Sequence, residues 1–419
     1  QIDKDSNNSS KPPSSDIKPN KKDIPNNRTK SAKKVGGQKE HKGYHLSKEY
    51  VEENIANENF NHIVKHVGAI SDKYVSKYIL DISVQVNATE YRFYANEKGK
   101  IKIPKEFKTD VQYGPEIKTL CTVLNVNDVV SIDRLTDFVN LISHVKIKMS
   151  NGTIPNIINK LSGKLTPIME KMRQQILNSK KLNTDATSAR CNSRNVSVRN
   201  YSTDNHTLLY AIKGKSKADL EKTGILPQYQ GTLIHDHETV MYNYGTDHVE
   251  CNVHVTRYLI GNYDIAKNKW SKDMISFLCD LNEYKKELIS IGIKETSKNK
   301  LEKYFNRYDE IIRDAREQNK KVKSITFRHE EKKLINRLEK YKDNHLKFIA
   351  NFVMPFDNNL SERELQHVKT KQKISGAFNS MEGLQNYLNI KSIIITCKKK
   401  GDDFYTFLND IFENRPVTI

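Results

Sequence analysis

Cysteine and long hydrophobic runs are scarce in this sequence of 419 residues. The five cysteines are scattered and contain no CxxC pair. This pattern argues against a disulfide framework and favours a reducing compartment. No apolar run approaches the roughly 20 residues that a membrane-spanning helix needs. The sequence therefore predicts a cytoplasmic protein that has no membrane partner.

Acidic residues are outnumbered by basic ones. The chain has 70 lysines and arginines against 51 aspartates and glutamates, which gives a formal net charge of +19. Hydrophobic residues make up 36% and charged residues 29%, as in a globular protein with polar extensions. An excess of positive charge favours a polyanionic partner, above all DNA. A lysine-rich composition that reflects an AT-biased genome accounts for the charge equally well.

The N-terminal quarter of the chain contains two regions. Residues 1–45 have almost no large apolar side chain, and basic residues outnumber acidic ones there by eleven to five. We predict a disordered basic arm for this segment. Residues 46–110 contain short runs in which apolar residues occupy every second position, which predicts a small β-rich region. These runs are 77–80, 82–86 and 90–94.

The rest of the chain alternates between helical and strand-like spacing. Residues 111–180 are helical, and their two last helices are compatible with a DNA-binding helix-turn-helix and equally with an ordinary helical hairpin. We predict a mixed core in two parts, 181–263 and 348–419, separated by a charged helical insertion at 264–347. The predicted strands are 195–201, 207–213, 232–235 and 248–253, and the predicted helices of the second part are 360–368, 381–397 and 402–412.

Three acidic residues stand where a metal-dependent nuclease would need them. Two-metal cleavage of a phosphodiester requires carboxylates that hold two cations about 4 Å apart. A ribonuclease-H-like sheet supplies one Asp on its first strand, one Asp after its fourth, and a carboxylate on a later helix. Asp185, Asp236 and Glu362 fit this order, with spacings of 236 − 185 = 51 and 362 − 236 = 126 residues. Three acids chosen among 51 are weak evidence by themselves.

Several motifs resemble one family in order along the chain. Residues 355–365 read PFDNNLSEREL and residues 369–376 read KTKQKISG. Both resemble the C-terminal signature of the insertion-sequence-66 family of DDE transposases. Five shorter stretches and one arginine agree with the same family: NSSKPPS at 8–14, GGQ at 36–38, QYGP at 112–115, GTLIHD at 231–236, and CNVH at 251–254 followed by Arg257.

The resemblance implies a ribonuclease-H-like catalytic domain of α+β or α/β class, with a mixed sheet flanked by helices. It implies that Asp185, Asp236 and Glu362 are the catalytic residues and the ligands of two divalent cations, Mg²⁺ or Mn²⁺. The implied activity is cleavage at the ends of an insertion sequence and strand transfer into target DNA. The implied partners are the terminal inverted repeats, target DNA, further copies of the chain on DNA and small accessory proteins of the same element, all at the bacterial nucleoid.

Basic residues near these acids are candidates for binding the DNA backbone. Arg363 follows Glu362 and could bind a phosphate with two hydrogen bonds, although a surface salt bridge is the plainer interpretation. His254 and Arg257 lie one helical turn apart and are expected to line the site. Lys369, Lys371 and Lys373 follow in what we predict to be a basic turn, where solvated lysines and phosphate contacts look alike in sequence.

Other residues near the predicted site leave alternatives open. His248, Cys251 and His254 are of zinc-binding type, but no fourth ligand is evident, so we do not predict zinc there. We expect Asn358 and Asn359 to cap the helix that carries Glu362.

The chain departs from the family near its N-terminus. Members often carry a zinc ribbon with two CxxC pairs, whereas residues 64–100 contain no cysteine. We therefore predict that residues 46–110 fold without zinc. The loss also leaves open an alternative: a decayed, inactive transposase that acts only as a DNA-binding protein.

Overall fold

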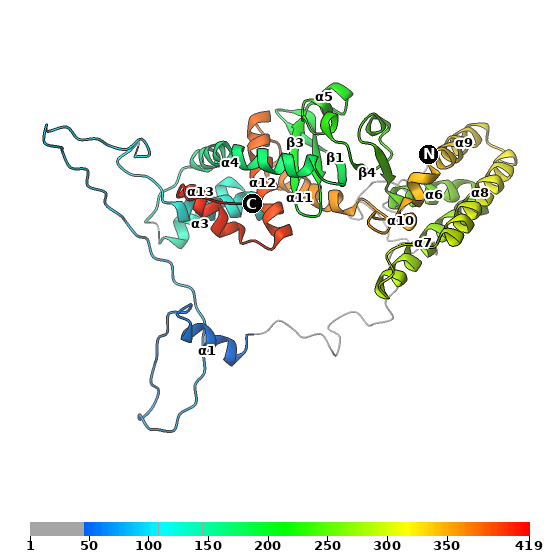
Figure 1. Cartoon of the computed structure of the whole chain (residues 1–419). Coiled ribbons are helices and arrows are strands. Elements are labelled where there is room, and N and C mark those ends of the chain that lie inside the picture. Colours follow the sequence, from blue (N-terminus) through cyan, green and yellow to red (C-terminus); the bar gives the residue numbers. More distant parts are fainter. Residues whose placement is uncertain (1–45, 108, 145) are drawn as a thin grey trace.

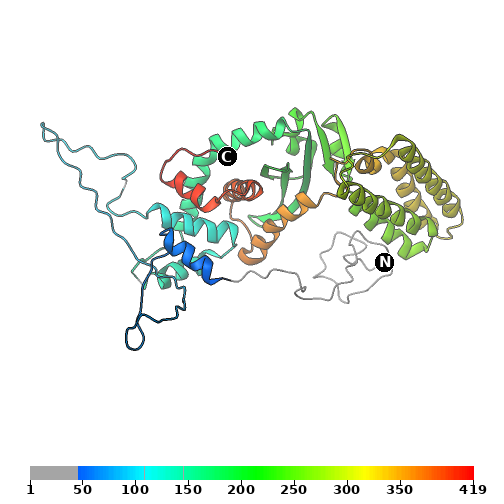
Figure 2. The same ribbon diagram turned by 60° about the horizontal axis from the view of Figure 1, so that its bottom comes forward.

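The computed structural model describes residues 46–107, 109–144 and 146–419, and the predicted basic arm at 1–45 lies outside these ranges. A mixed five-stranded sheet covered by helices forms the centre (Figure 1). A second group of helices extends from one end of it, and the chain between residues 57 and 107 runs away from both (Figure 2). The predicted combination of helices with a mixed sheet is confirmed. None of the described helices is long and apolar enough to span a membrane.

The sheet has the strand order β3-β2-β1-β4-β5. The β1–β2 and β2–β3 pairs are antiparallel, whereas the β1–β4 and β4–β5 pairs are parallel. The strands are β1 (Lys181–Cys191), β2 (Arg194–Ser202), β3 (Thr207–Ile212), β4 (Thr232–His235) and β5 (Asp247–Glu250).

Three of the four predicted strands are confirmed with little change. The fourth, predicted for 248–253, ends at Glu250 because helix α6 (Asn252–Ala266) begins directly after it. A two-residue turn fixes the register of β1 against β2. Asn192 and Ser193 both have positive φ, 46° and 61°, as a tight hairpin turn requires for right-handed strands. The resulting register places Asp185 opposite Asn200.

Helix α12 (Met381–Lys400) covers the sheet and closes its β3 edge. Backbone N–H groups of β3 donate to three polar side chains of this helix at 2.9–3.1 Å, those of Gln385, Ser392 and Thr396. Without such partners a buried strand edge would leave donors unpaired. The apolar residues of α12 pack between the sheet and helix α4 (Thr153–Leu177).

The helices before the sheet are part of the same hydrophobic core. Helices α2 (Pro115–Thr122) and α3 (Ile132–Ile142) precede α4, and buried side chains of all three belong to the cluster that fills the sheet's core. A π-helical turn (Val123–Asn127) separates α2 from α3. Helix α2 packs against the C-terminal helix α13 (Phe404–Phe412). The two helices predicted at the end of 111–180 are confirmed, but they are built into the core.

The helical insertion predicted for 264–347 belongs to a subdomain with its own core, and this subdomain begins earlier, with α6 at Asn252. Its members are α6, α7 (Lys269–Ser290), α8 (Lys298–Lys320), α9 (Ile325–Lys340) and α10 (Lys342–Ala350). The subdomain buries Trp270, the single tryptophan of the chain, whose Nε1 donates to Glu331 at 2.9 Å. Side-chain amides of Asn262, Asn268 and Asn319 also donate to Glu331, so this buried carboxylate ties three helix segments together.

The strands predicted at 77–80, 82–86 and 90–94 are not formed. Residues 46–107 contain helix α1 (Lys48–Ala56) and one isolated bridge between Ala95 and Ile101. Most apolar side chains of these runs are exposed, for example Ile79 at 94%. Alternating residues form a stable strand only where one face is buried or a third strand pairs. The prediction of a β-rich region was wrong because no such surface is available to it here.

A buried ion pair holds helix α11 (Asn359–Ser375) on the sheet. Lys399 of α12 lies 2.7 Å from the carboxylate of Glu364 on α11, and both side chains are at most 11% exposed. Asn200 of β2 and Thr207 of β3 donate to the same carboxylate at 2.9 and 3.0 Å, and Ser202 also contacts it. Glu364 therefore connects α11 to two strands and to α12.

Replacing Lys399 should destabilise the fold. Lys399→Met leaves the Glu364 carboxylate buried without its cation, so we expect the free energy of unfolding to fall by about 3 kcal/mol. Urea unfolding followed by circular dichroism measures this. The control is Lys333→Met, which removes an exposed partner of Glu330 at 2.9 Å and should cost less than about 0.5 kcal/mol. Equal stability of the two variants would contradict the assigned role of Glu364.

Candidate active site

The three predicted acidic residues come from three different elements. Asp185 lies within β1, Asp236 directly follows β4, and Glu362 is in the first turn of α11. Strands β1 and β4 are parallel, with Asn183 opposite Ile234. Two further steps of this register bring Asp185 opposite Asp236. Because neighbouring strands lie about 4.8 Å apart, these two residues are neighbours at the carboxyl end of β4.

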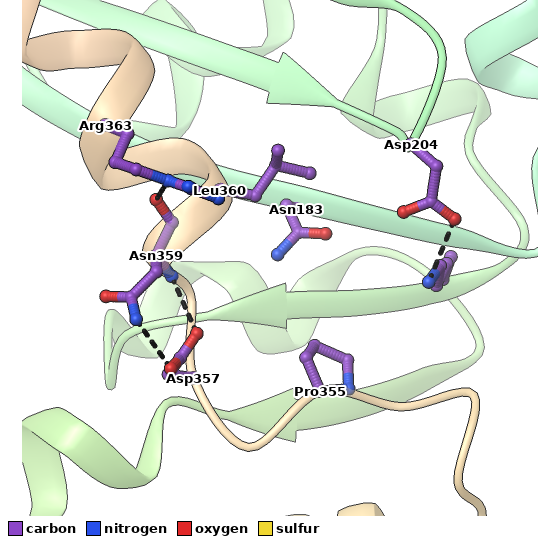
Figure 3. Close-up of a pocket in the computed structure, with 8 residues that line it drawn as sticks. Asn183, Asp204, Pro355, Asp357, Asn359, Leu360 and Arg363 are labelled. Atoms are coloured by element: carbon purple, nitrogen blue, oxygen red, sulfur yellow. Dashed lines mark hydrogen bonds and ion pairs between the residues drawn. The ribbon is translucent and has the colours of Figure 1, made fainter. Parts of the chain in front are cut away.

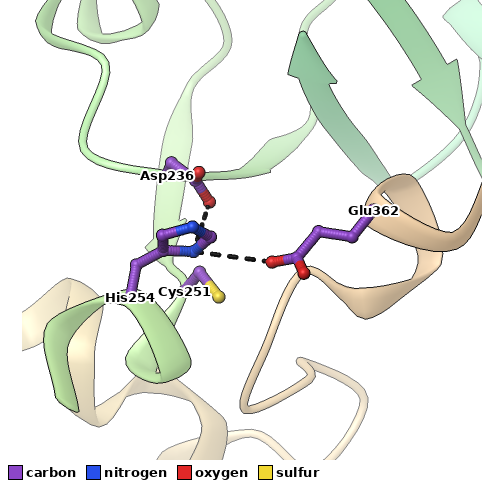
Figure 4. A group of neighbouring side chains, drawn as sticks. All are labelled: Asp236, Cys251, His254 and Glu362. Carbon is purple, nitrogen blue, oxygen red and sulfur yellow. Dashed lines mark ion pairs between the residues drawn. The ribbon is translucent and has the colours of Figure 1, made fainter. Parts of the chain in front are cut away.

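The imidazole of His254 lies between the carboxylates of Glu362 and Asp236. Nδ1 of His254 lies 3.0 Å from Oδ1 of Asp236 and 3.5 Å from Oε1 of Glu362 (Figure 4). Cys251, at the N-cap of α6, completes a group of four residues whose ligand atoms all lie within 4.8 Å of one another. The fold thus brings together two residues that are 126 positions apart in the sequence.

The carboxylates and the imidazole change one another's pKa. Burial and the neighbouring charge of Asp236 raise the pKa of Asp185 to about 6. Burial alone would lower the pKa of His254, but its contacts with Asp236 and Cys251 raise it above its usual range. Burial also raises the pKa of the Cys251 thiol. The Nδ1–H of His254 therefore faces Asp236 and Glu362, while its Nε2 accepts from Arg257.

The donor set fits a divalent cation. Oδ1 of Asp236 and Oε1 of Glu362 are buried, and both face Nδ1 of His254. One imidazole N–H cannot fully compensate two buried carboxylates, and the arrangement therefore favours a cation between them. Mg²⁺ and Mn²⁺ prefer carboxylate oxygens. Asp236 and Glu362, with Asp185 beside them on the sheet, are the residues that could hold such an ion.

Asn358 positions the helix that carries Glu362. We expected its side chain to cap the helix, but the amide is buried against β1. Its Nδ2 donates to the carbonyl of Thr184 at 2.9 Å, and its Oδ1 accepts from Asn183 at 2.8 Å. The backbone N–H of Asn359 instead donates to Oδ1 of Asp357 at 3.1 Å. The sequence analysis did not predict a role for Asn183. The one feature that points to it is its position two residues before Asp185, on the same face of the strand.

Two of the predicted phosphate-binding residues have different surroundings. Nη1 of Arg257 lies 3.2 Å from Nε2 of His254, on the side of the imidazole away from the carboxylates. Arg363 is exposed and lines a separate pocket beside the start of α11 (Figure 3). Lys181 lines the same pocket and pairs with Asp204 at 3.1 Å. Asp204 and Asp357 also line the pocket, so its two cationic side chains are matched by two acidic ones.

The predicted basic turn is helical, and this separates its three lysines. Helix α11 continues to Ser375, so Lys369 and Lys373 are four residues apart and share an exposed face. Lys371 points to the opposite side, is 6% exposed, and donates to the carbonyl of Asn125 at 3.2 Å. Burial lowers the pKa of Lys371 to about 8. Its predicted contact with DNA does not agree with this position, and Lys371 instead fastens α11 to the π-helical turn.

The histidines around Asp236 do not join the ligand group. His235 is buried, and its Nε2 lies 3.2 Å from Nδ1 of His248. His237 contacts Glu250 at 3.1 Å. His248 is therefore directed away from Cys251 and His254, and the zinc combination that the sequence suggested, His248 with those two residues, is not assembled.

Comparison with known proteins adds two family matches. A family model described as the transposase IS66 family matches residues 110–386, a range that contains Asp185, Asp236 and Glu362. A family of unknown function (DUF6444) matches residues 1–47. A 78-residue segment is 37% identical to the uncharacterized protein y4jO of Sinorhizobium fredii (strain NBRC 101917 / NGR234). That match covers 19% of this chain and 24% of the relative, so the chain spans about a quarter of the relative's length.

Asp185→Asn should stabilise the cation-free protein above pH 6. The pKa of Asp185 is about 6 in the folded state and near 3.8 when unfolded, so the folded protein retains a proton between these values. Stability should therefore fall as the pH rises through this window, and the variant avoids the loss. We expect a gain of up to about 3 kcal/mol at pH 8 and none below pH 4.

Urea unfolding in the presence of EDTA, between pH 4 and pH 8, tests this expectation. Asp204→Asn, which changes an acid that is 68% exposed, is the control and should show no such pH-dependent gain. If Asp185→Asn is no more stable than the parent protein at pH 8, Asp185 does not experience the charge of Asp236.

Proposed function

Because the chain belongs to the IS66 family of transposases, we propose that it cleaves DNA at the ends of an insertion sequence and joins the ends to target DNA. The observation that carries this proposal is the meeting of Asp236 and Glu362, with Asp185 on the adjacent strand. Spatial convergence of residues so far apart in sequence is what a shared cation site needs. The recognised ends, oligomers on DNA, accessory proteins and location at the nucleoid are parts of the same proposal.

A ribonuclease-H-like fold is consistent with the strand topology. Three antiparallel strands, β1 to β3, are followed by two strands that extend the sheet in parallel beyond β1. One acid lies in the first strand, one directly after the fourth, and one in a later helix. This is the arrangement that the family resemblance implies, with the helical subdomain inserted between the second and third acids.

In the proposed reaction, Asp185, Asp236 and Glu362 would hold two divalent cations, Mg²⁺ or Mn²⁺. Such cations activate the attacking oxygen and stabilise the leaving oxygen of a phosphodiester. The chain's own residues place the DNA: Arg363 and Lys181 line the pocket beside Glu362, and Lys369 with Lys373 extend the cationic surface along α11. Water attacks first, and the freed 3′-hydroxyl then attacks target DNA without a covalent enzyme intermediate.

An inactive, DNA-binding protein is the alternative. It is favoured by residues 57–107, which lack both the cysteines of a zinc ribbon and regular strands in the structure. The two functions are separated by metal-dependent strand transfer, because a protein that only binds DNA retards it without producing cleaved or joined strands. A nuclease without transposase activity would yield cleaved strands alone.

Asp236→Asn should abolish cleavage while preserving DNA binding. The substitution keeps the side-chain size but removes a charge that would hold a cation, so we expect cleavage to fall at least a thousandfold. Affinity should remain within about twofold, because it comes mainly from lysine and arginine contacts with phosphates. Labelled DNA that carries the ends flanking this coding sequence, incubated with Mg²⁺, measures both properties.

Asp314→Asn, an exposed acid on α8, is the matched control and should cleave as the parent does. Cleavage by Asp236→Asn at the parental rate would refute the metal site. An inactive parent protein that still binds the DNA would support the alternative.

The exposed lysines of α11 should set the salt dependence of DNA binding. Lys369→Ala combined with Lys373→Ala removes two phosphate contacts, so the slope of log affinity against log salt should become shallower by about 1.8. Lys371→Ala should not change the slope, because its ammonium group is buried against Asn125. Fluorescence anisotropy at several salt concentrations measures the slopes. An unchanged slope in the double variant would remove α11 from the DNA-binding surface.

A further inference from the structure

We propose that Asp236, Cys251, His254 and Glu362 form a tetrahedral site for a transition-metal ion of the Zn²⁺ class, and that this ion inhibits the Mg²⁺-dependent reaction. The inhibition rests on the function proposed above, whereas the binding of the ion does not. The zinc combination considered from sequence used His248, which the structure directs elsewhere. In the proposed site, Asp236 and Glu362 join Cys251 and His254 to complete the set of four ligands.

The geometry is close to that of a tetrahedral centre. Bond lengths of about 2.0–2.3 Å place the ligand atoms of a zinc site roughly 3.3–3.8 Å from one another. The four atoms here all lie within 4.8 Å of one another, and Nδ1 of His254 is already 3.0 Å and 3.5 Å from its two carboxylate neighbours. Small side-chain movements would therefore bring all four within bonding distance of one ion (Figure 4).

The backbone holds these ligands in place. Cys251 and His254 belong to one turn at the start of α6, where the N–H of His254 donates to the carbonyl of Cys251 at 3.1 Å. Asp236 leaves β4, and Glu362 lies in the first turn of α11. Ligands from three packed elements are already near one another without an ion, which reduces the ordering that binding requires.

The chemistry of the ligands favours Zn²⁺ over Mg²⁺. A thiolate and an imidazole nitrogen are ligands of Zn²⁺ and related ions, whereas Mg²⁺ prefers oxygen. Three of the four atoms, Oδ1 of Asp236, Nδ1 of His254 and Oε1 of Glu362, are buried, and the imidazole nitrogen lies 3.0 and 3.5 Å from the two oxygens. The fourth, Sγ of Cys251, accepts a hydrogen bond from the backbone N–H of Asn358 at 3.3 Å. Such outer hydrogen bonds stabilise ligands of bound metals.

One neighbouring side chain has to move. When Nδ1 of His254 binds an ion, Nε2 carries the ring proton, and it then faces the guanidinium of Arg257 at 3.2 Å. Two donors cannot share this contact, so Arg257 turns away. Zinc would therefore occupy two of the catalytic carboxylates and also displace an arginine that is proposed to face DNA, and these two effects together explain inhibition.

Cobalt substitution tests the site directly. The purified full chain is titrated with Co²⁺, which reports tetrahedral geometry by intense visible absorption and a thiolate ligand by a near-ultraviolet charge-transfer band. We expect both signals in the parent protein. Cys251→Ser should lose the charge-transfer band and bind Zn²⁺ at least tenfold more weakly in competition with a chromophoric chelator. Cys279→Ser, at another buried cysteine, is the control and should match the parent.

Circular dichroism confirms that each variant is folded before titration. Weak absorption typical of octahedral Co²⁺, or a charge-transfer band that survives Cys251→Ser, would overturn the proposal.

In a second measurement, cleavage in Mg²⁺ is followed as Zn²⁺ is added, relative to each protein's own zinc-free rate. We expect Cys251→Ser to need at least tenfold more Zn²⁺ than the parent for half inhibition, and equal sensitivity would refute inhibition through this site. If the parent cleaves no DNA, the proposed function fails, and the cobalt spectrum still decides the metal site.

Discussion

Asn358 joins helix α11, which carries Glu362, to strand β1, which carries Asp185, and to the start of α6. It bonds to Thr184 and Asn183 of β1 on one side, and its backbone N–H donates to Cys251 at the start of α6. All of these groups are buried, so an incorrect position would leave polar atoms unpaired at a cost of about 1–3 kcal/mol each. The amide therefore permits essentially one placement of α11 against β1, and Glu362 follows from that placement.

A second set of bonds protects this placement against the repulsion that the site itself creates. Three carboxylates near one another oppose folding when no cation is bound, as the raised pKa of Asp185 reflects. His254 offsets part of this repulsion by lying between Asp236 and Glu362. Glu364, two residues beyond Glu362, is held through Asn200, whose Oδ1 also accepts from the backbone N–H of Asp185 at 3.1 Å. Repulsion within the site is thus opposed by hydrogen bonds that tie α11 to the sheet.

The sequence indicates the elements of the core better than their contacts. Strands were predictable where short apolar runs lie between turn residues, as at 232–235. The prediction for Lys371 was wrong because the composition of this segment suits a turn as well as a continuing helix. Only the helical period places Lys371 on a different face of α11 from Lys369 and Lys373. The strands expected around residue 80 were wrong because alternation reports a capacity for burial, not the presence of a surface that provides it.

Buried carboxylates were the hardest to predict, since nothing in the local sequence distinguishes Glu250, Glu331 or Glu364 from exposed glutamates. Each accepts hydrogen bonds or ion pairs from residues far away in the chain. Asp236 and Glu362 were found because family motifs surround them, and the structure then brought them together. Their proposed catalytic role remains a prediction that rests on this proximity and on the family.

The attachment of the helical subdomain to the sheet explains how Glu362, 126 residues after Asp236, lies next to it. Glu250, at the end of β5, is fully buried and pairs with Arg337 of α9 at 2.8 Å and with His345 of α10 at 3.3 Å. Burial opposes its charge, but hydrogen bonds from His237 and His345 hold the pKa of Glu250 well below its usual range. The last helices of the subdomain are therefore fastened to the strand next to β4.

The chain leaves the subdomain close to where it entered. The N–H of Asn252, at the start of α6, donates to the carbonyl of Phe356 at 3.0 Å, and Nζ of Lys285 on α7 donates to the carbonyl of Met354. These bonds fix the segment that immediately precedes Asn358 and α11. The subdomain can therefore be long without loosening the site, because its first turn and its exit are bonded to each other. A break in this connection would displace Glu362 even though every residue of the sheet stayed in place.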